Sequence, residues 1–189
     1  MAENLATKPH ASGLEKLPAP TWDGSRKAYL TWKREFQHWM NKHGQDKDEQ
    51  LQVFLKAMPK GSWWTEQLKT CKNIDTAWEI LDIEFADKRK LMDELLAEID
   101  NYSTVKGDSK SLGRFETSIS VFVSDMENNG CPVHEVSEAP FFMSKLKPKD
   151  NADFGREMQR QKKEENVANL VAWLHQEAAF RSRGKKERN

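Results

Sequence analysis

The residue types that could do chemistry in this chain are few, and most lack the partners that such chemistry needs. Cys131 and His134 have the spacing of half a zinc site, but Cys71, the other cysteine, lies far away in the sequence. A structural zinc site takes four ligands, usually supplied as two such pairs. We therefore interpret residues 131–134 as a loop between helices and expect no bound metal.

The histidines and carboxylates give no clearer sign of a catalytic site. His38 and His43 are five residues apart, whereas two ligands on one helical face are four apart. The pair Asp93-Glu94 lies in a charge-rich segment, where hydration accounts for it. The sequence has no GxSxG, no HExxH and no Gly-rich phosphate loop. We expect no catalytic residue, no cofactor and no enzymatic activity.

Two clusters of basic residues could contact anions. Lys88-Arg89-Lys90 suits the solvated first turn of a helix better than a binding patch. Residues 181–189 carry 5 basic residues and 1 acidic residue, a density that suits contacts with RNA phosphates or a soluble linker. The candidate RNA-binding residues are Arg181, Arg183, Lys185, Lys186 and Arg188.

Composition limits the class of protein. The chain has 189 residues, of which 37% are hydrophobic and 32% charged, and its formal net charge is zero. Its 7 Trp and 9 Phe need burial, which argues against disorder. No apolar run reaches the ~20 residues of a membrane span, and the N-terminus lacks the apolar stretch of a secretory signal. Two cysteines are too few for a disulfide framework, so we expect a cytoplasmic protein.

Helical periodicity dominates from Asp23 onward, and alternating strand patterns are nearly absent. We predict the first helix over 25–43, with Tyr29, Trp32 and Phe36 on its inner face and Gly44 ending it. Asp46 then opens a second helix as its N-cap. A short helix over 62–71 should place Trp63, Trp64 and Leu68 inward, and a fourth starts near Asp75 or Thr76 and carries Trp78, Leu81 and Phe85.

The second half of the chain holds the clearest amphipathic stripe, formed by Leu112, Phe115, Ile119, Phe122 and Met126. The other helices are predicted over 87–102, 136–147, 151–164 and 166–182.

Six of the seven tryptophans precede residue 80, which suggests two lobes with differently built cores. The fold is therefore predicted to be all-α and two-lobed, with about nine helices, four in the first lobe and five in the second. The predicted divisions are a flexible arm (1–20), an N-terminal lobe (21–86), a C-terminal lobe (87–182) and a basic tail (183–189).

The order of these features resembles the capsid region of Gag proteins from LTR retrotransposons. The resemblance rests on a proline-containing lead-in followed by Trp-Asp-Gly, on residues 48–64 and 76–87, and on residues 111–132 and 141–148, which look like the second lobe of Bel/Pao-type Gag. It covers roughly residues 17–165, and no single motif is specific. Lys145-Leu146-Lys147-Pro148 departs mildly from the family's Lys-Leu-Pro-like turn.

The resemblance implies a two-lobed structural protein that self-associates, through pentamers and hexamers, into a virus-like shell that packages RNA in the cytoplasm. RNA would bind the basic tail or a region outside this chain, because no zinc knuckle is present. It leaves open whether the chain belongs to an active transposon, to a longer Gag polyprotein or to a domesticated host protein. The alternative is a soluble helical adaptor that binds partner peptides between the helices of the first lobe without forming shells.

One helix offers a candidate contact between copies. In 136–147, Ala139, Phe142, Met143 and Leu146 complete an inward stripe, and Phe141 points about 100° away from it. An aromatic ring on an otherwise polar face suggests self-association, with Glu138, Phe141 and Lys145 as the candidates. The alternative is that Phe141 packs on the last helix of its own chain.

Overall fold

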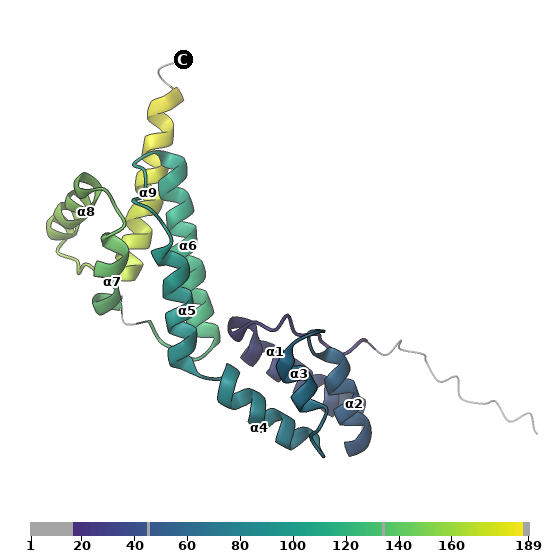
Figure 1. Cartoon of the computed structure of the whole chain (residues 1–189). Helices are drawn as coiled ribbons and strands as arrows, with labels where there is room; N and C mark the ends of the chain where they lie inside the picture. Colours follow the sequence, from purple (N-terminus) through teal and green to yellow (C-terminus); the bar gives the residue numbers. More distant parts are fainter. Residues whose placement is uncertain (1–16, 45, 134, 187–189) are drawn as a thin grey trace, which may run out of the picture.

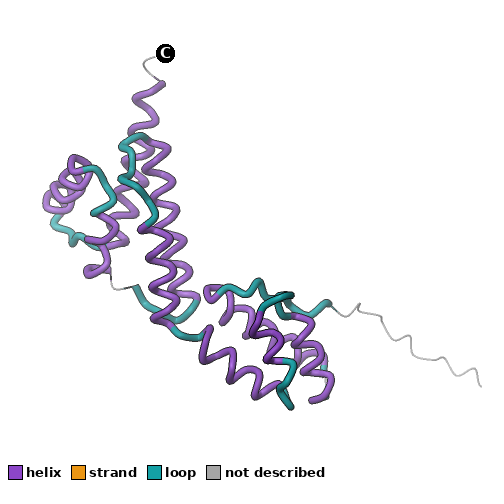
Figure 2. Tube along the Cα trace, in the orientation of Figure 1, coloured by secondary structure: helices purple, strands orange, loops and turns teal. Residues whose placement is uncertain are grey.

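The computed structural model describes residues 17–44, 46–133 and 135–186, with the backbone alone at 135–137 and 185–186. Within these ranges the chain forms nine α-helices and no strand, so the predicted all-α class is confirmed (Figure 1). Figure 2 shows α1–α4 gathered at one end, and α5, α6 and α9 running alongside one another at the other. Helices α7 and α8 lie to one side of these three.

Capping residues fix several ends of the first four helices. They are α1 (Arg26–His43), α2 (Lys47–Ala57), α3 (Trp63–Leu68) and α4 (Ile74–Phe85). Ser25 caps α1, and Gly44 ends it in the left-handed conformation that glycine adopts without strain. The Asp46 carboxylate accepts bonds from the amides of Asp48 and Glu49, as predicted for an N-cap.

Aromatic rings fill the interior of this part, which we call the N-terminal core. The Trp22 and Trp32 rings stack with centroids 5.4 Å apart, and Trp78 meets Phe54 edge-on at 4.8 Å. Trp32 donates its indole N–H to the Pro20 carbonyl at 2.9 Å. The lead-in to α1 is therefore part of the core's hydrogen bonding, although residues 17–20 belong to the segment predicted as a flexible arm; residues 1–16 lie outside the described ranges.

The C-terminal core is built from five helices, α5 (Lys88–Asp100), α6 (Ser109–Asn128), α7 (Glu135–Met143), α8 (Pro148–Gln161) and α9 (Val167–Lys186). The stripe predicted on α6 is confirmed, because all five of its side chains are buried. They pack with residues such as Leu95, Phe142, Phe154, Leu170 and Leu174 from the other four helices.

Several local predictions differ from the structure, among them the helix predicted over 136–147, which ends at Met143. Trp63 was expected inside, but it is 71% exposed, since in a helix of six residues Trp64 and Leu68 already face the core. Helix α8 begins at Pro148 rather than 151, because proline suits the first turn. Helix α9 continues to Lys186 rather than 182, so the start of the predicted tail is helical.

Polar contacts join the two cores. The Arg26 side chain is 9% exposed and donates to the carbonyl of Glu84 at 3.1 Å and to its carboxylate at 2.8 Å. The same guanidinium also bonds the Glu94 carboxylate on α5. The Asn129 side-chain amide donates to the Lys27 carbonyl at 3.1 Å. The start of α1 thus connects the end of α4, the side of α5 and the end of α6.

Candidate self-association surfaces and the basic end of the last helix

Phe141 on α7 is half-buried. Its ring meets the Phe142 ring edge-on at 5.5 Å and packs against the C-terminal core. The Lys145 ammonium lies 5.7 Å from the Phe141 ring centre, within cation–π range. Phe141 therefore packs against the C-terminal core, to which α9 contributes Val167, Leu170 and Leu174, and part of the residue stays accessible.

The two residues predicted to flank Phe141 on a polar face have different surroundings. Glu138 is only 9% exposed, so it is not part of an open polar surface. The Lys145 ammonium reaches across to α5, where it bonds the Asp100 carboxylate at 2.6 Å and the Asp100 carbonyl at 3.2 Å. The Lys145 carbonyl in turn accepts from the Val105 amide at 2.8 Å. Self-association through this face stays a prediction.

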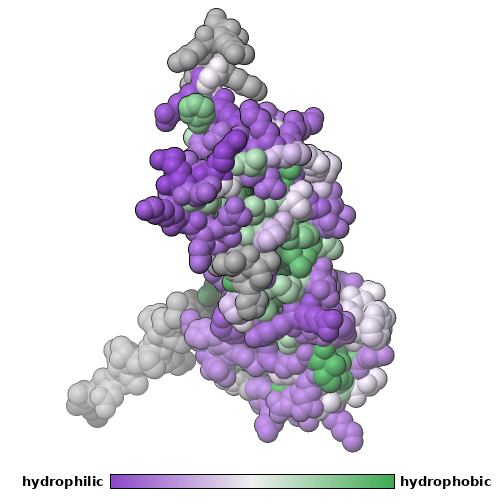
Figure 3. All heavy atoms as spheres, turned by 90° about the vertical axis from the view of Figure 1, so that its left-hand side faces the viewer, coloured by the Kyte–Doolittle hydropathy of each residue, from purple (hydrophilic) through white to green (hydrophobic). Residues whose placement is uncertain are grey.

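Large apolar side chains are exposed elsewhere, at places that the sequence did not mark. On the helices of the two cores, the most exposed are Ile83 at 79%, Trp63 at 71%, Phe180 at 71% and Val121 at 50%. Figure 3 shows that hydrophilic residues cover most of one face of the molecule, with hydrophobic residues reaching the surface in separate places. Such side chains are available for contacts with other molecules.

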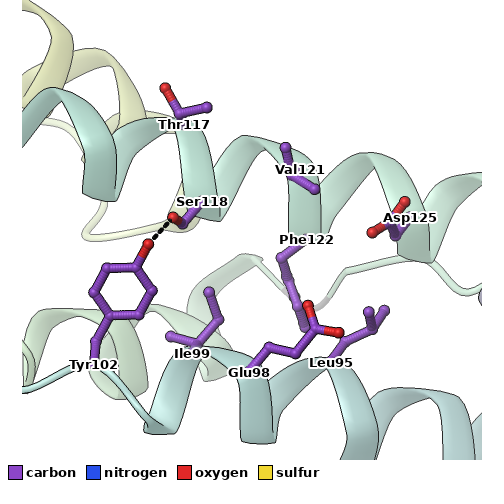
Figure 4. A pocket seen from close by; sticks show the side chains of 9 residues that line it. All are labelled: Leu95, Glu98, Ile99, Tyr102, Thr117, Ser118, Val121, Phe122 and Asp125. Carbon is purple, nitrogen blue, oxygen red and sulfur yellow. Dashed lines mark hydrogen bonds between the residues drawn. The ribbon is translucent and has the colours of Figure 1, made fainter.

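A groove of about 320 Å³ runs between α5 and α6 (Figure 4). Leu95 and Ile99 of α5 and Phe122 of α6 form its apolar floor. Tyr102 lies at one end, where its hydroxyl bonds that of Ser118. Glu98 and Asp125 come from opposite helices toward the other end, so the groove is apolar along its length and acidic at one end.

The predicted RNA-binding residues do not form one uniform patch. Arg183 is exposed near the end of α9, whose last turns continue through Lys185 and Lys186 and extend past the ends of α5 and α6 (Figure 1). Arg188 lies outside the described residues. Arg181 differs from the expectation, because its guanidinium is engaged inside the fold.

Arg181 holds three segments together. It donates to the Asp150 carboxylate at 2.7 Å, to Glu177 at 3.0 Å and to the Gly107 carbonyl at 2.5 Å. The Asp150 side chain is 5% exposed, so Arg181 supplies the positive charge that a buried carboxylate needs. Burial alone would lower the pKa of Arg181, but the bonds to Asp150 and Glu177 raise it above its usual value. A Cβ at Gly107 would lie 3.0 Å from both Arg181 and Asp150, so a larger residue there would crowd this pair.

The Lys88-Arg89-Lys90 cluster is a helix start, in agreement with its predicted role. The Asp87 carboxylate caps α5 by accepting from the amides of Arg89 and Lys90, and these bonds lower the pKa of Asp87. Lys88 donates to the Gly130 carbonyl at 3.1 Å, and Lys90 pairs with Glu84 at 3.0 Å.

Cys131 is a buried free thiol whose sulfur lies 3.7 Å from the Asn129 carbonyl oxygen, and His134 lies outside the described ranges. Among the residues that the structure describes, no three side chains of the metal-ligating types cluster together. None of the described helices combines the length and apolarity that a membrane crossing needs.

Comparisons of the chain with protein-family models, with curated proteins and with solved structures found no match.

Sequence reasoning missed two features of these surfaces. The Arg181–Asp150 pair joins residues 31 positions apart on different helices, and no local pattern marks it. The α5/α6 groove depends on how two helices pack. The outward position of Val121 on α6 could have been read from the stripe, since Val121 falls between the buried Ile119 and Phe122.

Proposed function

We propose that this chain is a structural protein whose copies self-associate into closed shells, as its resemblance to Gag capsid regions implies. The helical fold and its two separate hydrophobic clusters within the described ranges are compatible with that role. In this proposal the shells form in the cytoplasm from pentamers and hexamers and enclose RNA, which contacts the basic end of α9 or a further region.

The observation that carries the proposal is the exposure of large apolar side chains on helices of both cores. A shell subunit must contact several neighbours through different surfaces, because identical two-fold contacts alone produce only dimers. Trp63 on α3 and Ile83 on α4 supply such surfaces in the N-terminal core, and Val121 on α6 and Phe180 on α9 supply them in the C-terminal core.

One observation favours the alternative function of a soluble adaptor. A groove of about 280 Å³ lies between α1, α2 and α4 of the N-terminal core and includes Phe36, Met40 and Trp78. Helix–helix grooves with apolar walls bind amphipathic peptides. In this alternative the protein binds partner peptides there and stays monomeric or dimeric.

Particle size separates the two functions. Purified protein would be followed by light scattering and negative-stain electron microscopy across a series of salt and protein concentrations. Uniform round particles are expected for the shell protein. A monomer or dimer under every condition would overturn the proposal in favour of the adaptor, and a peptide pull-down with the full chain would then identify its ligands.

A further inference from the structure

The end of α9 presents an aromatic ring beside a cation. Phe180 is 71% exposed, and Arg183, also exposed, follows three residues later, which places both on one side of the helix. Both side chains border the same shallow hollow on α9. The sequence adds Lys185 and Lys186 just beyond, so this end of the molecule combines an apolar anchor with positive charge.

The α5/α6 groove has complementary properties. Its volume of about 320 Å³ is at the lower end of ligand-sized pockets, which suits one aromatic side chain and the helix turn that carries it. Val121 at its edge is 50% exposed. At the acidic end, the Glu98 carboxylate is 63% exposed and has Lys27 at 3.8 Å, and Asp125 lies across from it (Figure 4). A guanidinium that entered here would meet two carboxylates and would share Glu98 with the Lys27 ammonium.

Geometry excludes the groove of the same chain as the place where the α9 end docks. Ser109, at the start of α6, bonds the Ala178 carbonyl at 2.6 Å, so Phe180 lies beyond that end of α6. Asp125 is 16 residues farther along α6, or about 24 Å at 1.5 Å per residue. The matching surfaces are thus at opposite ends of α6, and only another molecule can bring them together.

We propose that Phe180 and Arg183 at the end of α9 dock into the α5/α6 groove of a second copy of this chain, with Phe180 against Val121 and Arg183 facing Glu98 and Asp125. This inference rests on the proposed self-association and names one of its contacts. In a pair joined by one such contact, one groove and one helix end stay free, so the contact can repeat head-to-tail into rings or chains.

Two single substitutions test the contact from its two sides in the full-length protein. Phe180→Ala removes the ring and keeps a good helix former, and Val121→Arg puts a cation at the groove that repels the basic helix end. Both positions are at least half exposed, so circular dichroism should show unchanged helix content. Each variant alone is expected to associate roughly 30-fold more weakly in sedimentation experiments, the loss typical of a central interface residue.

Mixing the two variants tests whether Phe180 and Val121 meet each other across the contact. The Phe180→Ala protein keeps its groove and the Val121→Arg protein keeps its helix end, so the mixture should form one-to-one pairs that neither variant forms alone.

An exchange of charge between the two sides of the contact gives a second test. Asp125→Lys and Arg183→Glu should each weaken association, and the double variant should recover most of it. Leu17→Ala, at a 65% exposed apolar position in the lead-in to α1 that the proposed contacts do not use, is the matched control and should leave this contact unchanged.

The outcomes separate this inference from the function on which it rests. If the wild type associates and these variants associate equally well, the docking contact is overturned and shell assembly stands. A mixture that stays monomeric while each single variant is impaired would overturn the pairing of Phe180 with Val121. If the wild type remains monomeric at every concentration, both proposals fail.

Discussion

The two cores of this chain bury different kinds of side chain. In the N-terminal core, rings from Trp22, Trp32, Phe36, Phe54 and Trp78 contact one another. In the C-terminal core, aliphatic side chains from α5, α6 and α9 dominate, and rings are scattered among them. A buried aromatic residue removes ~150–250 Å² from water, so a small body with few apolar residues gains most from rings.

Rings also bring polar atoms that need partners, and here the cores differ again. Trp32 donates its indole N–H to the Pro20 carbonyl in the lead-in. Trp22 donates its indole N–H to the Ser25 carbonyl in the turn before α1. Tyr29 donates to Asp82, which also pairs with Lys33. The N-terminal core is therefore bound to a segment outside its helices. In the C-terminal core, the comparable polar contact is Arg181 with Asp150.

The largest effect should come from removing a fully buried ring in either core. Phe36→Ala and Phe115→Ala should each lower the free energy of unfolding by about 3–5 kcal/mol, because each leaves a cavity. Urea unfolding followed by both tryptophan fluorescence and circular dichroism would measure it, since most tryptophans lie in the N-terminal core.

The two probes also test whether the cores are independent. If Phe36→Ala shifts the fluorescence transition more than the helical one, the cores unfold separately. If both probes shift together in both variants, the polar contacts of Arg26 are enough to make the cores one cooperative unit. A loss below about 1 kcal/mol would mean that the core repacks around the missing ring.

A smaller effect is expected from Arg181→Met in the C-terminal core. It leaves the Asp150 carboxylate buried without its cation, which should cost about 2–3 kcal/mol, less than for a fully buried pair because Arg181 is partly exposed. Thermal unfolding would measure the loss. Arg156→Met is the matched control, since its ion pair with Asp153 is on the surface and should contribute under about 0.5 kcal/mol. Equal losses in the two variants would contradict the structural role of Arg181.

The smallest effect concerns Tyr29 in the N-terminal core. Burial and the bond to Asp82 raise the pKa of Tyr29 well above its usual value of 10. In the unfolded chain the phenol ionises near pH 10, whereas in the folded chain it stays neutral, so the free energy of unfolding should fall as pH rises above 10. Tyr29→Phe should lose about 1 kcal/mol at neutral pH and show a shallower alkaline decline. Unfolding curves at a series of pH values would test this, and an equally steep decline in the variant would refute it.

Much of the fold follows from local patterns. The α6 stripe, the inner face of α1 and the caps at Asp46 and Gly44 could be predicted, because period and capping chemistry act within a few residues. Trp63 was predicted wrongly, because aromatic character alone does not show which side of a six-residue helix faces the core.

The roles of residues at the surface could be predicted from the sequence much less well than the helices. Glu138 becomes buried and Arg181 becomes a structural residue through contacts with distant segments. The position of Phe180 on α9 relative to Val121 in the α5/α6 groove depends on how these three helices pack. These features depend on how the helices pack against one another, and the periodicity of a single helix does not show this packing.

The junction at Arg26 has a consequence for how the molecule responds to salt. Its carboxylate partners Glu84 and Glu94 are about half exposed, and the neighbouring Lys27–Glu98 pair is also open to solvent. At ordinary salt the Debye length is roughly 8–10 Å, and dissolved ions weaken ion pairs that are open to solvent. The packing of rings and aliphatic side chains carries no charge and is not screened. A rise in ionic strength should therefore weaken these pairs at the junction between the cores before it affects either interior.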